Sequence, residues 1–269
     1  MPADLESVCR GAIEIIRPVG EFILSERRHF NNGAVELKGF NDLVSYVDKS
    51  SEVKLVQGLS ALLPGSGFIT EEKTAGNSGE EYVWVIDPLD GTTNYVHGIP
   101  CYCISVALLY RSVPVVGIVY ELNLNELFYA WEGSPAFLNG KIIAVSKRQS
   151  ASESLVATGF PYTDFSKMKE YMMVFDWCMK NTHGLRRLGS AAADLVYVAC
   201  GRFEAFYEYG LSPWDVAAGA LIVAQAGGRV TDFSDGNNFL FGKEIVASNT
   251  TVHNELLAVI AEKFSTGAV

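Results

Sequence analysis

Residues 84–100 have the sequence WVIDPLDGTTNYVHGIP, in which an apolar strand leads directly into two closely spaced carboxylates. The predicted strand ends at Asp87, a proline turns the chain, and Asp90 follows three positions after Asp87. We expect both carboxylates and the backbone carbonyl of Leu89 to face one pocket. Oxygen ligands of this kind suit a hard cation such as Mg2+.

The residues that follow favour binding of an anion beside that cation. The backbone N–H groups of Gly91 and Thr92 begin a new turn, and unpaired amides at such a turn bind phosphate. Taken alone, the pattern D-x-x-D-G is more simply a turn in which aspartate caps the backbone and glycine supplies a positive φ. The interpretation as a site therefore depends on other acidic residues elsewhere in the chain.

Two further carboxylates stand where an apolar element ends or begins. Glu71 follows a short apolar strand at 67–69, and Asp215 opens an apolar helix after Pro213, where it could serve as the N-cap. Three acid-bearing ends in one chain favour a shared cation site over three independent caps. We therefore predict that these carboxylates converge.

The composition excludes several classes of protein. The chain has 269 residues, of which 49% are hydrophobic and 19% charged, and its formal net charge is −10. A disordered chain would have fewer apolar residues and a higher charge density. A nucleic-acid binder ordinarily has a basic surface, so the acidic balance makes nucleic acid an unlikely main partner. The length suits one large domain or two lobes that share a core.

We expect a cytoplasmic protein with no membrane partner. The first 15 residues are acidic and amphipathic, which is unlike the basic segment and apolar run of a signal peptide. No window approaches the roughly 20 apolar residues of a membrane span. The five cysteines are odd in number and scattered, as is typical of reduced thiols in a cytosol.

The first 150 residues combine helical spacing with strand-like runs. Apolar positions within 4–30 predict a helix that Pro18 should kink or split. Residues 31–43 are polar and contain glycine, so we expect a mobile loop, followed by a helix that Asp48 caps and that ends near residue 64. Runs rich in Val, Ile, Tyr and Trp predict antiparallel strands at 82–87, 103–110, 113–122 and 126–133.

After residue 150, predicted strands and helices alternate as in an α/β layer. The strands are expected at 154–160, 202–209 and 245–249, and the helices at 166–181, 190–200, 214–228 and before Phe264. We therefore divide the chain into two lobes with a tight interface. Residues 1–150 form an N-terminal α+β lobe with most of the metal ligands, and residues 151–269 form a C-terminal α/β lobe that completes the site.

Several segments resemble the signature segments of the inositol monophosphatase family, whose members are Mg2+-dependent, lithium-sensitive phosphatases. The resemblance extends along nearly the whole chain and is strongest at EEKTAG (71–76), WVIDPLDGTTNYVHGIP (84–100) and PWDVAAGALIVAQAGG (213–228). It implies a layered αβαβα sandwich with an antiparallel-rich N-terminal sheet and a smaller C-terminal α/β lobe.

The resemblance also implies a site for two or three Mg2+ ions. Glu71 and Asp87 would hold the first ion together with the carbonyl of Leu89. Asp87, Asp90 and Asp215 would hold the second, and Glu71 could reach a weaker third ion.

Further roles follow from the same resemblance. Asp48 and Thr92 match the family's pair that positions the attacking water, with Glu71 assisting. The phosphate would be contacted by Gly91, Thr92 and Thr93. The hydroxyl-bearing part of the substrate would be contacted by Ala191, Glu208 and Asp215, and Lys38 matches the lysine of the family's mobile loop.

The implied activity is hydrolysis of a small phosphomonoester by a metal-activated water, in a homodimer. The best substrate is myo-inositol 1-phosphate or a similar polyol or sugar phosphate. Three alternatives stay open: an activity like that of fructose-1,6-bisphosphatase, a nucleotide 3′-phosphatase, and a regulatory protein that binds the RNA-processing machinery.

Overall fold

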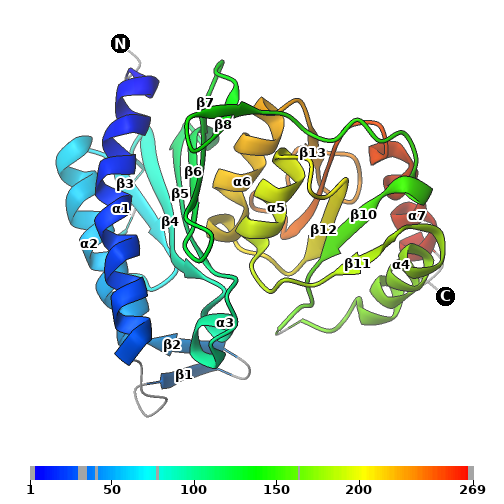
Figure 1. Cartoon of the computed structure of the whole chain (residues 1–269), viewed down its shortest axis with the longest axis horizontal. Helices are drawn as coiled ribbons and strands as arrows, with labels where there is room; N and C mark the ends of the chain where they lie inside the picture. Colours follow the sequence, from blue (N-terminus) through cyan, green and yellow to red (C-terminus); the bar gives the residue numbers. More distant parts are fainter. Residues whose placement is uncertain (1–3, 30–34, 40–41, 77–78, 163, 266–269) are drawn as a thin grey trace.

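The computed structural model describes residues 4–29, 35–39, 42–76, 79–162 and 164–265. For residues 35–39 and 42–45 the description covers the backbone alone. Its elements form five layers (Figure 1). A helical pair covers one face of a seven-stranded sheet, and a second pair separates this sheet from a five-stranded one, whose far face is covered by a third pair. The predicted αβαβα sandwich is therefore confirmed.

Each of the three helical layers contains a pair of helices. The outer pair on the first sheet is α1 (Leu5–His29) and α2 (Tyr46–Leu62). The central pair is α5 (Ala191–Ala199) and α6 (Pro213–Gln225). The pair on the second sheet is α4 (Met168–Asn181) and α7 (His253–Ser265), and a short α3 (Thr92–His97) lies beside the first sheet.

The first helix is not divided at Pro18, so of the two predicted effects, a kink or a split, the split is wrong and the kink stays a prediction. It runs without interruption for 25 residues. Val8, Ala12, Ile16 and Val19 lie on its buried face, whereas Pro18 is exposed. The carbonyl of residue 14, which a proline at position 18 leaves without a helical partner, is therefore on the side that faces solvent.

The loop predicted at 31–43 is replaced by an antiparallel hairpin of β1 (Val35–Gly39) and β2 (Asp42–Ser45). Apolar Val35 and Leu37 alternate with charged residues, which is the period of a strand that the sequence analysis did not use. Residues 31–34 and 40–41 lie outside the described part of the chain.

The seven-stranded sheet confirms the antiparallel strands predicted in the first half. Its order is β3-β4-β5-β6-β7-β8-β9, with only β3 and β4 parallel. Both residues of the turn between β5 and β6, Arg111 and Ser112, have positive φ, as a two-residue hairpin requires. The strands are β3 (Gly67–Thr70), β4 (Tyr82–Asp90), β5 (Cys103–Tyr110), β6 (Val113–Glu121), β7 (Glu126–Trp131), β8 (Ala136–Leu138) and β9 (Lys141–Ile143).

The five-stranded sheet is mixed, with the order β11-β10-β12-β14-β13. β10 pairs in parallel with β11 and β12, whereas β14 is antiparallel to both of its neighbours. The strands are β10 (Leu155–Thr158), β11 (Gly184–Arg186), β12 (Ala205–Tyr209), β13 (Arg229–Thr231) and β14 (Glu244–Ser248).

The central helices are mostly apolar, because each packs between the two sheets. All of Val216–Val223 in α6 is buried, and small residues predominate. A Cβ on Gly117 of β6 would lie 2.6 Å from the backbone oxygen of Ala218, so glycine is needed for this close approach. This packing brings the first turns of α5 and α6 to the carboxyl end of β4.

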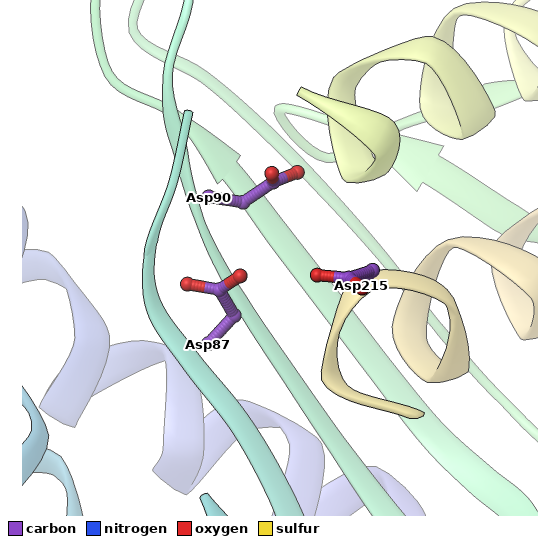
Figure 2. A group of neighbouring side chains, drawn as sticks. All are labelled: Asp87, Asp90 and Asp215. Atoms are coloured by element: carbon purple, nitrogen blue, oxygen red, sulfur yellow. The ribbon is translucent and has the colours of Figure 1, made fainter. Parts of the chain in front are cut away.

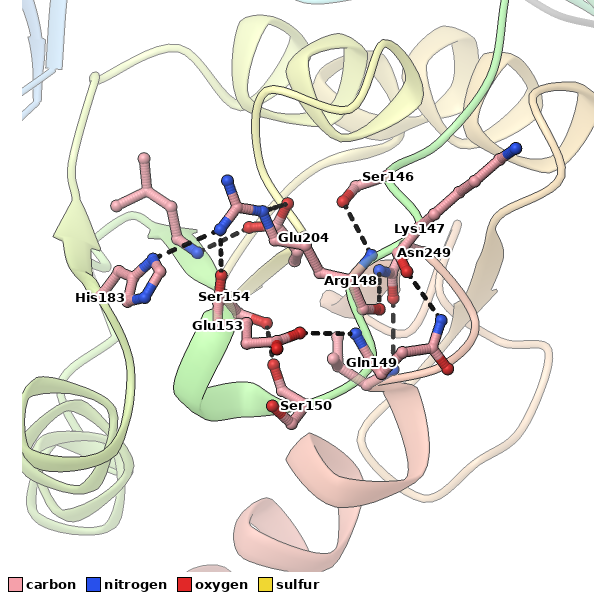
Figure 3. Close-up of polar contacts among 12 residues, drawn as sticks. Ser146, Lys147, Arg148, Gln149, Ser150, Glu153, Ser154, His183, Glu204 and Asn249 are labelled. Carbon is pink, nitrogen blue, oxygen red and sulfur yellow. Dashed lines mark hydrogen bonds and ion pairs between the residues drawn. The ribbon is translucent and has the colours of Figure 1, made fainter.

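The segment that joins the two sheets is fixed by polar contacts (Figure 3). Arg148 forms an ion pair with buried Glu204 at 3.2 Å, and the Asn249 side chain donates a hydrogen bond to the Arg148 carbonyl. The predicted lobe boundary at residue 150 falls in this segment, and the division remains a prediction. In the described residues, no helix is both long enough and apolar enough to cross a membrane.

Candidate active site

The backbone at the end of β4 is irregular, and this irregularity turns two carboxylates in one direction. The strand continues to Asp90, with a shift of register between Asp87 and Asp90. An Asp87 oxygen accepts a 2.9 Å hydrogen bond from the N–H of Leu89. Gly91 then has φ 95°, and a Cβ there would lie 2.9 Å from the carbonyl oxygen of Cys101. Glycine is therefore required where the chain leaves the strand.

Three carboxylates meet at this point, as Figure 2 shows. Oxygens of Asp87, Asp90 and Asp215 all lie within 4.8 Å of one another. Asp215 comes from the first turn of α6. The sequence suggested it as the N-cap of this helix, and that suggestion is wrong. Ser212 is the N-cap, and Asp215 at the third helical position accepts a 2.6 Å hydrogen bond from the Ser212 N–H in a capping box. The same carboxylate thus caps the N-terminus of the helix and belongs to the cluster.

Burial and mutual repulsion disfavour ionisation in this cluster. Burial raises the pKa of Asp87 well above its usual value, and the charges of Glu71, Asp90 and Asp215 raise it further. Burial and the charge of Asp90 do the same to the pKa of Asp215. The pKa of Asp90 is raised to about 6 by burial, against the opposing effect of hydrogen bonds from Ser190 and Ala192.

This donor set fits a divalent cation. Glu71 lines the same cavity and acts electrostatically on Asp87, so four carboxylates share a small volume. A hard cation with oxygen ligands would neutralise them and restore their ionised form. The cluster could hold a metal on the chemistry of its residues alone.

A buried hydroxyl and carboxylate pair lies beside the cluster. The Thr92 hydroxyl is 2.9 Å from an Asp48 carboxylate oxygen and 3.0 Å from the Leu89 carbonyl oxygen. Asp48 is fully buried. A hydroxyl has a single proton, so donation to Asp48 leaves the Leu89 carbonyl free to accept from, or coordinate, another group. Asp48 lies in the first turn of α2, which begins at Tyr46 rather than at Asp48 as predicted.

The residues assigned to the site by resemblance lie around one cavity of about 250 Å3. Its lining includes Glu71, Asp87, Leu89, Asp90, Gly91, Thr92, Thr93, Ala191, Glu208 and Asp215. Asp48 is reached through Thr92. Lys38 is in β1, and its side chain lies outside the described residues.

Several residues of this region were not assigned roles from the sequence, among them Arg187, Ser190 and Asp194. Ser190 is the N-cap of α5, and its hydroxyl donates a 2.8 Å hydrogen bond to Asp90. Arg187 and Asp194 both line the cavity. A serine before the apolar run 191–199 is a helix-start signal that could have indicated Ser190. The side on which Asp194 lies depends on how α5 packs, which no local signal gives.

Comparison with known proteins identifies the family of the chain. A model of the inositol monophosphatase family matches residues 4–266. The chain belongs to this family. As a member of the inositol monophosphatase family it is a phosphatase, and the acidic cluster agrees with the general metal dependence of the family.

Relatives within the inositol monophosphatase family have two kinds of name. The chain is 41% identical over 251 residues to a Neisseria meningitidis protein named putative Nus factor SuhB, covering 93% of this chain and 96% of the relative. It is 37% identical to the inositol monophosphatase of Dictyostelium discoideum, covering 96% and 97%. The solved inositol monophosphatase of Anabaena (Nostoc) sp. PCC 7120 superposes with a TM-score of 0.86 at 33% identity, covering 97% of each chain.

Proposed function

We propose that the protein is a Mg2+-dependent phosphomonoesterase that hydrolyses myo-inositol 1-phosphate or a similar polyol or sugar phosphate. The observation that carries this proposal is the convergence of Asp87, Asp90 and Asp215 within 4.8 Å, beside the hydrogen-bonded pair of Thr92 and Asp48. The arrangement supplies ligands for cations and a separate hydroxyl that can orient a water molecule. Both are what hydrolysis of a phosphate ester needs from a protein.

Two or three Mg2+ ions would be held by the carboxylates around the cavity. We assign Glu71, Asp87 and the Leu89 carbonyl to one ion, and Asp87, Asp90 and Asp215 to a second, with Glu71 available to a weaker third. When bound, the ions neutralise the phosphate and lower the pKa of a bound water. The Leu89 carbonyl oxygen has two lone pairs, so it can coordinate an ion beside its 3.0 Å contact with the Thr92 hydroxyl.

Thr92 and Asp48 would position the water. Thr92 lines the cavity, and when its hydroxyl donates to the buried Asp48 carboxylate, its lone pairs are left to accept from a water. A water that donates to Thr92 is then held at one place and in one orientation. Positioning of this kind lowers the activation free energy, because the water has already lost its translational and rotational freedom before the reaction begins. No serine or cysteine nucleophile is needed, and the thiol of Cys103 has a pKa raised well above its usual value by burial.

The remaining cavity residues divide between the two ends of the substrate. Gly91, Thr92 and Thr93 stand at the start of α3 and would contact the phosphate. Ala191, at the start of α5, and Glu208, at the end of β12, would contact the hydroxyl-bearing part, together with Asp215. Lys38 would act from the hairpin of β1 and β2.

The proposal is tested by release of inorganic phosphate from a panel of esters, after chelation and with added Mg2+. The panel contains myo-inositol 1-phosphate, fructose 1,6-bisphosphate, a nucleoside 3′-phosphate and phenyl phosphate. We expect hydrolysis of the inositol ester only with Mg2+, and inhibition by lithium, as the family resemblance implies. Hydrolysis that is unaffected by chelation, or preference for the bisphosphate or the nucleotide, would refute this assignment.

The names of some relatives favour a second candidate function. Proteins that are 36–41% identical to this chain are called Nus factor SuhB, and we propose as the alternative a regulatory role with RNA-processing machinery. Asp215→Asn separates the two. In a host strain that lacks its own copy of the protein, rescue by a variant without phosphatase activity would show that the regulatory role suffices.

Two further properties belong to the proposal. We propose a homodimer, which light scattering would identify by a mass twice that of the 29.3 kDa chain. We also propose a cytoplasmic location, which is supported by the free thiols of all five cysteines. A monomer at micromolar concentration, or disulfides in the protein isolated from its source, would contradict these two statements respectively.

A further inference from the structure

A carboxylate with no assigned role lies in the wall of the cavity. Asp194 is in the first turn of α5, one helical turn after Ala191, and lines the cavity. Its exposed fraction is 1%, and its Oδ1 atom has no hydrogen-bond partner among the described residues. A buried polar atom without a partner lowers stability, and such atoms are rare in folded proteins.

Three other buried carboxylates, which lie away from the cavity, are hydrogen-bonded, unlike the Oδ1 atom of Asp194. Glu52 accepts from the N–H groups of Glu72 and Thr74 at 2.7 and 2.9 Å. Glu121 accepts from Asn123 at 2.9 Å and from the N–H of Leu124 at 2.6 Å. Glu204 accepts from Leu155 at 2.7 Å and pairs with Arg148 (Figure 3). No comparable bonds hold Asp194 Oδ1, and unlike these three glutamates Asp194 lines the cavity.

The charges around Asp194 suit a neutral, hydroxyl-bearing ligand. Burial and the nearby charges of Glu208 and Asp90 raise the pKa of Asp194 well above its usual value, while the Arg187 guanidinium opposes them. Arg187 is the one cationic side chain that lines the cavity in the described part of the chain. It is held by a 2.7 Å hydrogen bond to the Tyr162 hydroxyl and lies over the rings of Phe160 and Tyr162.

We propose that Asp194 is a substrate-binding residue that accepts a hydrogen bond from a hydroxyl group of the leaving alcohol, with Arg187 donating to an oxygen of the same alcohol. This deepens the proposed function, on which it rests, by naming the class of alcohol. A hydroxyl both donates and accepts, so a polyol satisfies a carboxylate and a guanidinium together. A second phosphate at this end of the cavity would lie beside the carboxyl groups of Asp194 and Glu208. Of the described residues that line the cavity, Arg187 alone would offset their repulsion, so a bisphosphate is disfavoured.

The test compares hydrolysis of a polyol ester with that of an ester without hydroxyls. In Asp194→Ala, kcat/KM for myo-inositol 1-phosphate should fall by about 3- to 10-fold, because the hydrogen bond to the substrate hydroxyl is lost. For phenyl phosphate, kcat/KM should stay within about twofold of wild type, because that leaving group never contacts Asp194. Asp194→Asn, which keeps the shape of the side chain, should give a smaller change in the same direction.

Thermal denaturation separates this role from a structural one. Because Oδ1 has no partner to lose, Asp194→Asn should leave the Tm unchanged or raise it. Glu204→Gln is the matched control, since it alters a buried carboxylate that is fully bonded and remote from the cavity. It should lower the Tm and leave the preference for the polyol ester unchanged.

The outcomes distinguish the inference from the proposed function. Equal losses on both esters, or no loss on the polyol ester, would overturn the role of Asp194 while the phosphatase assignment stands. A wild-type protein that hydrolyses neither ester with Mg2+ would overturn both. A lower Tm in Asp194→Asn, with unchanged substrate preference, would show that the residue is structural.

Discussion

The replacement of Thr92 by valine removes one hydroxyl and keeps the shape of the side chain. In the structure this hydroxyl donates to the fully buried Asp48 carboxylate at 2.9 Å. If the pair orients the attacking water, its loss should lower kcat by about 10²- to 10⁴-fold, the usual contribution of a positioned acid or base. This corresponds to about 3–5 kcal/mol of activation free energy.

The same substitution should have smaller effects on metal binding and stability. Thr92 contributes no ligand to the metals in our assignment, so the Mg2+ concentration for half-maximal activity should stay within about threefold of wild type. Loss of a hydrogen bond to a charged group should lower the free energy of unfolding by about 1.5–3 kcal/mol. The variant should therefore remain folded at the temperature of the assay.

The assay is steady-state release of phosphate from myo-inositol 1-phosphate across a range of Mg2+ concentrations, with denaturation followed in parallel. Thr92→Ser is the matched control, because it retains the hydroxyl and should keep most of the wild-type kcat. A Thr92→Val variant with more than a tenth of the wild-type kcat would refute the reasoning. So would a variant that loses activity solely through weaker Mg2+ binding.

Three further results are expected. Asp215→Asn should abolish turnover and raise the Tm of the metal-free protein, because it relieves the repulsion within the cluster; a fall in Tm or normal turnover would contradict this. Gly159→Ala should fold but hydrolyse the polyol ester more slowly, since the new Cβ would lie 2.1 Å from the Glu208 carboxylate oxygens and displace them; unchanged kinetics would exclude Glu208 from substrate binding. Buried His253, bonded to Ser248 and Thr231, has a pKa lowered to about 4, so the folded form disfavours its protonation and stability should be lost as pH falls from 6.5 to 4. His253→Gln should remove about 1.4 kcal/mol per pH unit from that slope in urea denaturation, and an identical slope would show that His253 does not titrate as described.

Much of the first sheet could be predicted because its strands are marked locally. Val, Ile and aromatic residues fill the runs at 82–87, 103–110 and 113–122, and the short polar turn of Arg111 and Ser112 separates the last two. The hairpin of β1 and β2 was missed because a glycine-containing polar segment outweighed its brief alternation of apolar and charged residues. The continuity of α1 through Pro18 depends on the proline being on the exposed face, which is a property of the packing.

The site was predictable where its residues are close in sequence and harder to predict where they are distant. Asp87 and Asp90 lie three positions apart, so a local turn could indicate them. Asp215 is 125 positions after Asp90, and its place beside them follows only from α6 packing between the sheets. Asp194 was missed although it lies three positions after Ala191, the spacing of residues on one helix face. That face reaches the cavity only because α5 begins beside Asp90, through the contact of Ser190 with that carboxylate.

The acidity of the chain gains a local meaning from the structure. Part of the net charge of −10 is concentrated in buried carboxylates whose ionisation is costly without a cation. The protein should therefore bind an anionic phosphate ester poorly until metal ions neutralise the cavity.

The most direct measurement of this central claim is anomalous diffraction from crystals soaked in Mn2+, which replaces Mg2+ at oxygen-ligand sites and can be located by its scattering. We predict anomalous peaks among Asp87, Asp90 and Asp215, with a further peak that is bound by Glu71, Asp87 and the Leu89 carbonyl. The absence of a peak in this cluster at millimolar Mn2+, or peaks confined to other parts of the molecule, would contradict the assignment of the cluster as a metal centre.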